Sequence, residues 1–272
     1  MADTTAMLIE WSIFLALGLV AGLLAGLLGI GGGLVIVVVL AWLLPRMGVP
    51  PEAAMHAALA TALASIVFTA MASARAHHLR GSVLWPSVWR LVPGLLAGGV
   101  LGGLLATQLE GIVLRALVSV YCFVAAVQIG FGSARHGGAR PDAPRSPWLA
   151  PAGVGIGAVS ALVGIGGGSM TVPLLVYLGI PPVRAVGTSS ACGVAIGLAS
   201  AAAYALFGPA GALPEGGLGY VYVPAAVGIA LASILAAPYG TRLAHVLSGP
   251  ALRRVFAVFL VVVGASLWLP VH

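Results

Sequence analysis

The pentapeptide Gly-Ile-Gly-Gly-Gly occurs twice in the chain, at residues 29–33 and at residues 164–168. Each copy follows an apolar segment and precedes a short apolar run, residues 34–44 in the first case and 169–179 in the second. Eleven helical residues rise only about 16 Å, roughly half of the hydrocarbon core of a bilayer. A short apolar segment beside a glycine turn, at matching places in two halves, predicts a broken or re-entrant membrane helix in each half.

The composition places these segments in a membrane. Of the 272 residues, 61% are apolar and 7% are charged, and the mean hydropathy is +1.13. Soluble proteins are nearer 45–50% apolar and about 25% charged, so an ordinary soluble enzyme is excluded, as is a disordered chain. The net charge of +6 comes from arginines scattered between apolar runs, so we expect no nucleic-acid partner. The fold class predicted is an all-α polytopic membrane protein in a lipid bilayer.

The doubled pentapeptide divides the chain into two repeats. We expect a first transmembrane repeat over residues 1–132, a cytoplasmic linker rich in Gly, Arg and Pro over 133–147, and a second transmembrane repeat over 148–272. Each repeat should contain about five helical segments. Their predicted bounds are about 11–28, 34–44, 52–74, 85–106 and 112–131 in the first repeat, and 148–163, 169–179, 183–207, 220–240 and 251–269 in the second.

Arginine placement gives a topology. If the loop with Arg75, His77, His78 and Arg80 is cytoplasmic, alternation of the segments puts ten of the twelve arginines on the cytoplasmic side. Equivalent loops of the two halves then face opposite sides, so the repeats are predicted to be inverted. A multi-pass protein of the bacterial inner membrane with both termini outside, in the periplasm, is expected.

The glycine turns are the first candidate binding groups, at Gly31, Gly32, Gly33, Gly166, Gly167 and Gly168. Glycine lets successive backbone N–H groups point at one spot, and each turn leads into a helix start with unpaired N–H groups and about half a positive charge. These features together bind anions. The alternative is close helix packing, which also uses glycine. The spacings Gly18/Gly22/Gly26, Gly94/Gly98/Gly102 and Gly193/Gly197 favour such packing.

Hydroxyl side chains are the second set of candidates: Thr61, Ser65, Ser169, Thr188, Ser189 and Ser190. They could donate hydrogen bonds to an oxyanion. Alternatively, they bond neighbouring helices or the carbonyl one turn back. His56 is a candidate proton carrier, or else an interfacial histidine. No Asp or Glu lies at the centre of any segment, and Cys122 and Cys192 lie singly in apolar runs. We therefore expect no catalytic residues, no metal and no cofactor, and hence no enzyme.

With these residues, the sequence resembles the TauE/SafE family of sulfite and organosulfonate exporters. The resemblance rests on the doubled pentapeptide, the Pro-Pro pairs at 50–51 and 181–182, and the stretches at 76–83, 219–225 and 236–240. It implies a membrane transporter of small sulfur-containing anions, proton- or ion-coupled, with motif positions at Gly29, Gly31–Gly33, Gly164, Gly166–Gly168, Thr188 and Ser189. The two halves differ at two motif positions. Pro173 of the second half corresponds to Val38 of the first, and the first half has Ala60-Thr61-Ala62 where the second half has Gly187-Thr188-Ser189.

The function predicted is secondary transport of sulfite, an organosulfonate or sulfoacetate across the bacterial inner membrane by alternating access. The small-molecule anion and the bilayer are the expected partners. Three alternatives stay open: an anion channel, a transporter of another small solute, and a membrane scaffold or assembly protein that transports nothing. A scaffold would need no broken helices, and a channel would show neither saturation nor counter-ion dependence.

Overall fold

The computed structural model describes residues 2–28, 32–131, 148–214, 216–244, 246 and 249–268, and within them the chain is almost wholly helical. The helices are α1 (Ala2–Leu28), α2 (Gly33–Leu43), α3 (Pro51–His78), α4 (Trp85–Gln108), α5 (Gly111–Phe131), α6 (Leu149–Val163), α7 (Gly168–Tyr177), α8 (Pro182–Phe207), α9 (Val223–Ala244) and α10 (Gly249–Ser266). A 3₁₀ turn, Leu44–Met47, extends α2, and strands β1 (Gly217–Leu218) and β2 (Val221–Tyr222) form an antiparallel hairpin.

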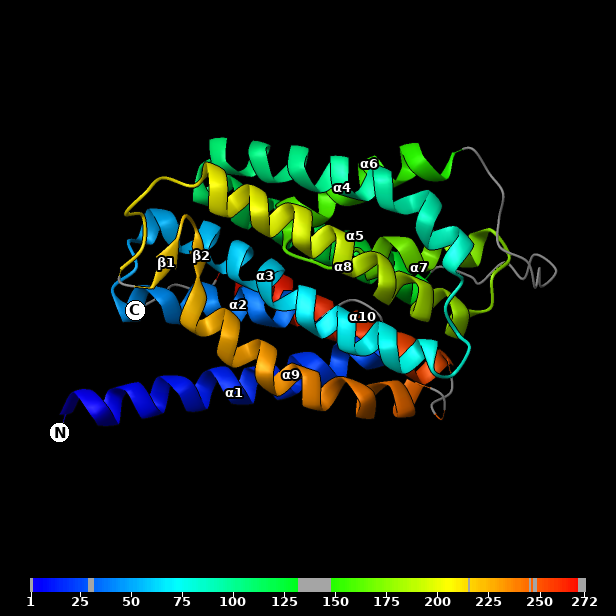
Figure 1. Cartoon of the computed structure of the whole chain (residues 1–272), viewed down its shortest axis with the longest axis horizontal. Coiled ribbons are helices and arrows are strands. Elements are labelled where there is room, and N and C mark those ends of the chain that lie inside the picture. The colour runs from blue at the N-terminus through cyan, green and yellow to red at the C-terminus, as the bar shows by residue number, and fades with distance from the viewer. Residues whose placement is uncertain are drawn as a thin grey trace.

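Six of the described helices are long and apolar enough to cross a membrane: α1, α3, α4, α5, α8 and α9. The helices lie roughly along one axis of the molecule (Figure 1). The prediction of an all-α polytopic membrane protein is therefore confirmed. The two short segments are also found, since α2 has 11 residues and α7 has 10.

Local sequence explains the helix boundaries. α3 and α8 each begin at the second proline of a Pro-Pro pair, where the missing N–H is not needed and the fixed φ suits a helix. α6 ends at Gly164, whose φ of 73° is left-handed and whose N–H donates to the carbonyl of Ser160. Glycine tolerates this conformation without a steric penalty, so the chain can leave α6 and turn into α7 within four residues.

α3 and α8 form the centre of the bundle. They pack against each other, and their spanning windows are more buried than those of the other four candidate spans. α2 packs on α3 and α7 on α8, while α9 also covers α3 and α4 also covers α8. The remaining main pairs are α1 with α9, α4 with α6, and α5 with α10. Each of these pairings has its counterpart when α1–α5 are exchanged for α6–α10.

Glycine lets the α1–α9 and α4–α6 pairs approach closely. A methyl group built on Gly22 would lie 2.5 Å from the Ser233 carbonyl oxygen, and one on Gly98 would lie 2.1 Å from that of Val154. Gly197 of α8 meets the Leu63 backbone of α3 in the same way. The packing role predicted for the glycine spacings is therefore confirmed.

Two parts of the chain differ from expectation. The segment expected to be helical from residue 220 begins with the β1–β2 hairpin, and α9 starts only at Val223. The expected loop at residues 75–80 is largely helix, because α3 continues to His78. His77 is 0% exposed and its Nε2 lies 3.3 Å from the Gly26 carbonyl oxygen, so a helix contact replaces the expected loop position.

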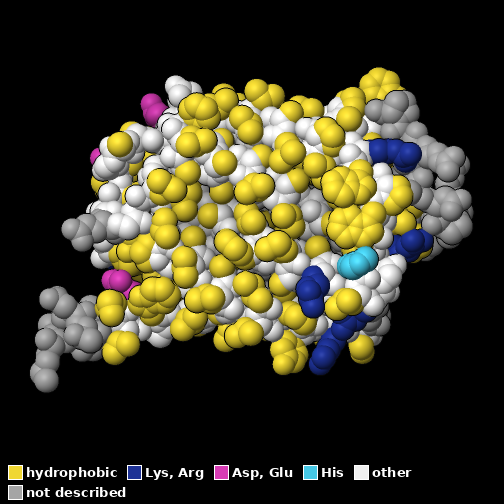
Figure 2. All heavy atoms as spheres, in the orientation of Figure 1, with side chains coloured by type: hydrophobic (Ala, Val, Ile, Leu, Met, Phe, Trp, Pro, Cys, Tyr) yellow, Lys and Arg dark blue, Asp and Glu magenta, His cyan; other side chains and the backbone are white. Residues whose placement is uncertain are grey.

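Charged side chains lie at the ends of the bundle. On the face shown in Figure 2, the arginines lie toward one end and the acidic side chains toward the other. The side of the bundle between these ends is mostly hydrophobic, as a surface in contact with lipid acyl chains must be.

Candidate functional site

The two glycine turns meet inside the bundle. A methyl group built on Gly33, the first residue of α2, would lie 2.3 Å from the carbonyl oxygen of Gly164. From this contact α2 runs toward one end of the bundle and α7 toward the other (Figure 1). The N-termini of both short helices therefore point at the interior, where their partial positive charges add.

Both helix starts need glycine for conformational reasons. Gly32 and Gly167 are the N-cap residues of α2 and α7, with φ of 67° and 73°. Gly166 and Gly168 are buried beside Gly167. The candidate Gly31 lies outside the described residues.

Several backbone N–H groups at the two helix starts have no backbone acceptor among the described residues. Among the residues that the structure describes, no backbone carbonyl accepts a hydrogen bond from the N–H groups of residues 33–35 or 166–169. The first acceptors are Gly32, which receives from Ile36, and Gly167, which receives from Met170 and Thr171. Open N–H groups at the start of a helix are the usual way in which proteins bind an oxyanion without a cation.

The turns lie against the middle of α3 and α8. A methyl group on Gly164 would come within 2.7 Å of Leu59, and one on Gly167 within 2.3 Å of Ile196. A methyl group on Gly193 would lie 3.1 Å from the Gly166 carbonyl oxygen. Leu59 and Ile196 therefore give the two turns apolar neighbours, and a low local dielectric strengthens electrostatic interactions.

Three hydroxyls lie around the α7 start. Ser169 is in its first turn, and its Oγ is hydrogen-bonded to the hydroxyl of Tyr121 on α5. Ser160 at the end of α6 and Thr171 in α7 are fully buried. Tyr121, Ser160 and Thr171 were not among the predicted site residues, although aligning the two pentapeptides would have shown that positions 160 and 171 are polar only in the second half.

The candidates Thr61 and Ser65 contact strand β2 and the start of α9, respectively. Thr61 Oγ1 accepts a hydrogen bond of 2.9 Å from the N–H of Tyr222. Ser65 Oγ donates to the carbonyl of Thr61 at 2.8 Å and lies 3.5 Å from that of Ala226. In this conformation both hydroxyls bond backbone groups.

The candidates Thr188, Ser189 and Ser190 lie one to two turns from Gly193, toward the other end of α8. Thr188 Oγ1 accepts from the N–H of Leu84 at 3.0 Å, and Ser190 Oγ pairs with Ser73 Oγ at 3.0 Å. Ser189 is buried beside them.

The bonds of Thr61 and Thr188 are counterparts. Tyr222 and Leu84 immediately precede α9 and α4, and both helices have proline at their second residue. Each central helix thus fixes the start of a helix from the other half. A buried N–H that loses such an acceptor costs about 1–3 kcal/mol.

His56 is buried near the end of the bundle that holds the hairpin. Its Nε2 lies 2.9 Å from the Leu109 carbonyl oxygen, and its ring stacks on Tyr220 with centroids 4.6 Å apart. Nδ1 is buried and has no hydrogen-bond partner among the described residues. Burial raises the pKa of the Tyr220 phenol, so the stacked ring stays neutral.

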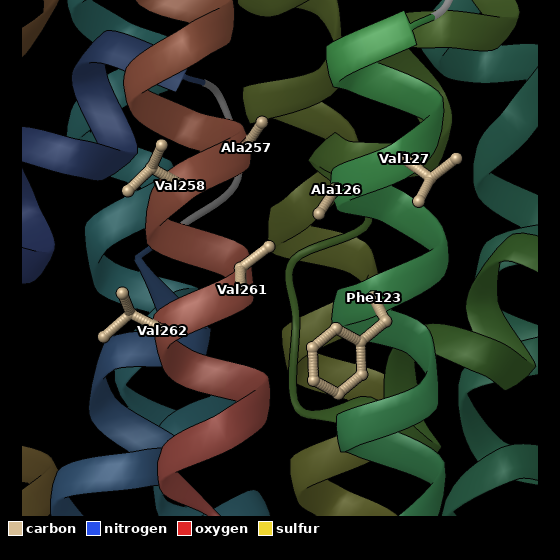
Figure 3. A pocket seen from close by; sticks show the side chains of 7 residues that line it. All are labelled: Phe123, Ala126, Val127, Ala257, Val258, Val261 and Val262. Atoms are coloured by element: carbon tan, nitrogen blue, oxygen red, sulfur yellow. The ribbon is translucent and has the colours of Figure 1, made fainter.

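A separate groove lies on the lipid-facing side, between α5 and α10 (Figure 3). It has a volume of 310 Å³ and is lined by Phe123, Ala126 and Val127 of α5 and by four apolar residues of α10. These side chains offer no hydrogen-bond donor, so an anion would find no partner there. No group of three or more His, Cys, Asp or Glu side chains is close enough to hold a metal ion within the part of the chain described.

The fold and the site define a polytopic α-helical membrane protein in which two broken helices meet at their N-termini. Comparison with known proteins identifies its family. The profile of the family described as "Sulfite exporter TauE/SafE" matches residues 14–267. A protein of Haemophilus influenzae described as "Probable membrane transporter protein" is 34% identical over 261 residues, which cover 94% of this chain and 97% of the relative. No solved structure matches the chain.

The chain belongs to the TauE/SafE family and is a membrane transporter, not an enzyme.

Proposed function

We propose that the protein moves a small sulfur oxyanion, such as sulfite or an organosulfonate, across the bacterial inner membrane as an ion-coupled secondary transporter. The observation that carries this proposal is the contact between the two glycine turns, where Gly33 at the start of α2 meets the carbonyl of Gly164, four residues before α7. Two helix N-termini that begin near this contact and run in opposite directions would form a site for negatively charged oxygens. The family description supports the sulfur chemistry.

The electrostatics favour an anion of charge −1. Each helix N-terminus contributes about half a positive charge, so the pair offsets about one negative charge. Among the described residues, the buried polar side chains include two histidines but no Arg, Asp or Glu. A dianion would keep one charge uncompensated in a water-excluded site, which is costly. Bisulfite and simple organosulfonates therefore fit better than sulfate or sulfoacetate.

Alternating access would follow from two inverted repeats. The matching helix pairs and the opposite directions of α2 and α7 support this relation between the halves. One repeat would rock against the other around the glycine turns. The concentration of arginine at one end of the visible face supports a cytoplasmic position for that end, with both termini in the periplasm.

Binding of these anions is the direct test. In detergent, a ligand at 100 times its dissociation constant stabilises a protein by about 2.7 kcal/mol, which raises its melting temperature. We expect methanesulfonate and bisulfite to bind at least about 10-fold more tightly than sulfate and sulfoacetate, a difference of about 1.4 kcal/mol. In proteoliposomes, labelled sulfite should show saturable uptake and counterflow.

Three outcomes would contradict this proposal. The absence of stabilisation by every sulfur oxyanion would remove the anion site. Conductance without counterflow would indicate a channel, while tighter binding of sulfate would contradict the charge argument.

His56 is the proposed proton carrier. Imidazole is the side chain that commonly exchanges protons near neutral pH. His56 projects from α3 between the turn before α5 and the hairpin, where it contacts Leu109 and Tyr220. Tyr220 faces its ring, while Glu52, four residues before it, and Glu110, next to its hydrogen-bond partner Leu109, are exposed. We expect His56→Gln to keep sulfite counterflow within about two-fold of wild type and to lose its acceleration by an imposed pH gradient, because glutamine bonds like imidazole but does not titrate.

The measurement is gradient-driven uptake in proteoliposomes, compared with counterflow at equal pH on both sides. Undiminished acceleration by the gradient in His56→Gln would show that another group carries the proton.

A further inference from the structure

The turn before α7 is surrounded by hydroxyl groups that the turn before α2 lacks. When the two pentapeptides are aligned, three buried positions are polar in the second half and apolar in the first: Ser160 corresponds to Ala25, Ser169 to Leu34 and Thr171 to Ile36. The two halves of the anion site therefore differ in chemistry, although their backbone geometry is alike.

Ser160 lies directly at the α7 start. Its carbonyl accepts from the N–H groups of Gly164 and Ile165 and so holds the turn in place. A methyl group built on Gly167 would lie 3.4 Å from Ser160 Oγ, which puts this hydroxyl beside the N-cap of α7. The side chain is 0% exposed, and Oγ has no hydrogen-bond partner among the described residues.

Thr171 repeats this pattern one turn into α7. Its N–H donates to the Gly167 carbonyl at 2.7 Å, so the residue stacks directly over the N-cap. Its side chain is also 0% exposed, and Oγ1 is without a partner within the described part of the chain. A buried hydroxyl without a partner is unfavourable, and a ligand that accepts from it relieves that cost.

Ser169 is held differently. Its Oγ is already bonded to Tyr121 of α5, which connects the first turn of α7 to a helix of the other half. That bond gives Ser169 a fixed position and leaves Ser160 and Thr171 as the hydroxyls with unused hydrogen-bonding capacity.

We infer that the α7 half is the principal binding half of the site, in which the hydroxyls of Ser160 and Thr171 donate to oxygens of the bound oxyanion together with the N–H groups of the turn. The α2 half supplies N–H groups and partial charge alone. The inference rests on the proposed anion-transport function and assigns that function to an unequal pair of half-sites. Separate donors from two elements suit an anion with several oxygens, and a halide would gain less from them.

The test compares two hydroxyl deletions with a matched control. Ser160→Ala and Thr171→Val remove the hydroxyls with little change of shape. Ser87→Ala is the control, because Ser87 is also fully buried and has no hydrogen-bond partner among the described residues, but lies in the first turn of α4, near the end of the bundle. Binding of methanesulfonate and of chloride is measured by thermal shift on the purified full chain in detergent.

We expect each deletion to weaken methanesulfonate binding about 10-fold, and the double variant about 100-fold, because hydrogen bonds to charged groups are strong. Chloride binding should change by less than about three-fold in the same variants, and Ser87→Ala should bind like wild type. Ser160→Thr, which keeps the hydroxyl, should retain most of the affinity. If Ser160→Ala does not fold, the methanesulfonate and chloride affinities of Thr171→Val and Ser160→Thr test the inference instead.

Failure of this inference differs from failure of the proposed function. Wild-type affinity in both Ser160→Ala and Thr171→Val, with methanesulfonate still stabilising the wild type, would overturn the α7 assignment and leave the anion site intact. A wild type that no oxyanion stabilises would overturn both.

Discussion

Gly33→Ala is expected to lower sulfite counterflow by about 100-fold or more. The added methyl group would lie 2.3 Å from the Gly164 carbonyl oxygen and 2.6 Å from Ile66, and the backbone atom cannot rotate away. The two helix starts must then move apart, which costs the bound anion two or more charge-assisted hydrogen bonds of about 1.5–3 kcal/mol each. Counterflow of labelled sulfite in proteoliposomes measures the loss.

The control for this variant is Gly155→Ala. Gly155 lies on an exposed face of α6, and a methyl group there would meet nothing within 4 Å. It should transport like wild type and be as stable or slightly more so, because alanine favours a helix over glycine. Transport is compared per folded molecule, using size-exclusion profiles and melting curves. Normal transport by folded Gly33→Ala would mean that the contact serves packing alone.

Gly98→Val should prevent accumulation of folded protein. A side chain at this position would enter the α4–α6 contact, where its Cβ would lie 2.1 Å from the Val154 carbonyl oxygen and 2.9 Å from the Ala158 nitrogen. Overpacking usually costs about 1–3 kcal/mol, and a clash with the backbone of two α6 residues, Val154 and Ala158, should exceed the upper figure. The yield of monodisperse protein after detergent extraction reports the effect.

The matched control is Gly155→Val, which places the same side chain on α6 where space is open. It should be extracted at wild-type yield. Gly22→Val tests the corresponding α1–α9 contact, where Cβ would lie 2.5 Å from the Ser233 carbonyl oxygen, and it should fail as Gly98→Val does. A Gly98→Val protein that melts like wild type would show that α4 and α6 can separate without penalty.

The broken helices could be predicted from sequence because their signal is local. An apolar run too short to span a bilayer, placed after a glycine turn, fixes both the length and the start of α2 and α7. The starts of α3 and α8 are likewise local, since a Pro-Pro pair marks each of them. The glycine spacings that indicate helix packing can also be read from sequence, because they depend only on a four-residue period. In the structure these glycines lie at helix contacts.

What sequence could not reveal depends on contacts between distant segments. The partner of Thr61 is Tyr222, and the partner of Thr188 is Leu84, so the predicted hydroxyls bond helix starts that only the tertiary fold brings near. The hairpin was missed because Val221 and Tyr222 continue the apolar pattern of α9, while its turn needs Gly219 at a φ of 54°. The candidate role of Thr61, Ser65 and Thr188–Ser190 in binding stays a prediction.

The pairing of α1 with α9 and of α4 with α6 has a consequence for biosynthesis. A ribosome completes both α1 and α4 before it reaches residue 149, where α6 begins, and α9 follows only from Val223. Until then, the glycine-lined faces of α1 and α4 lack the helices that cover them in the folded protein, α9 and α6. Both helices are therefore inserted in the bilayer before their packing partners are synthesised. The native helix pairs can form only when nearly all of the polypeptide has been inserted. Long sequence separation between partners slows such closure, because the entropy of the intervening chain must be lost first.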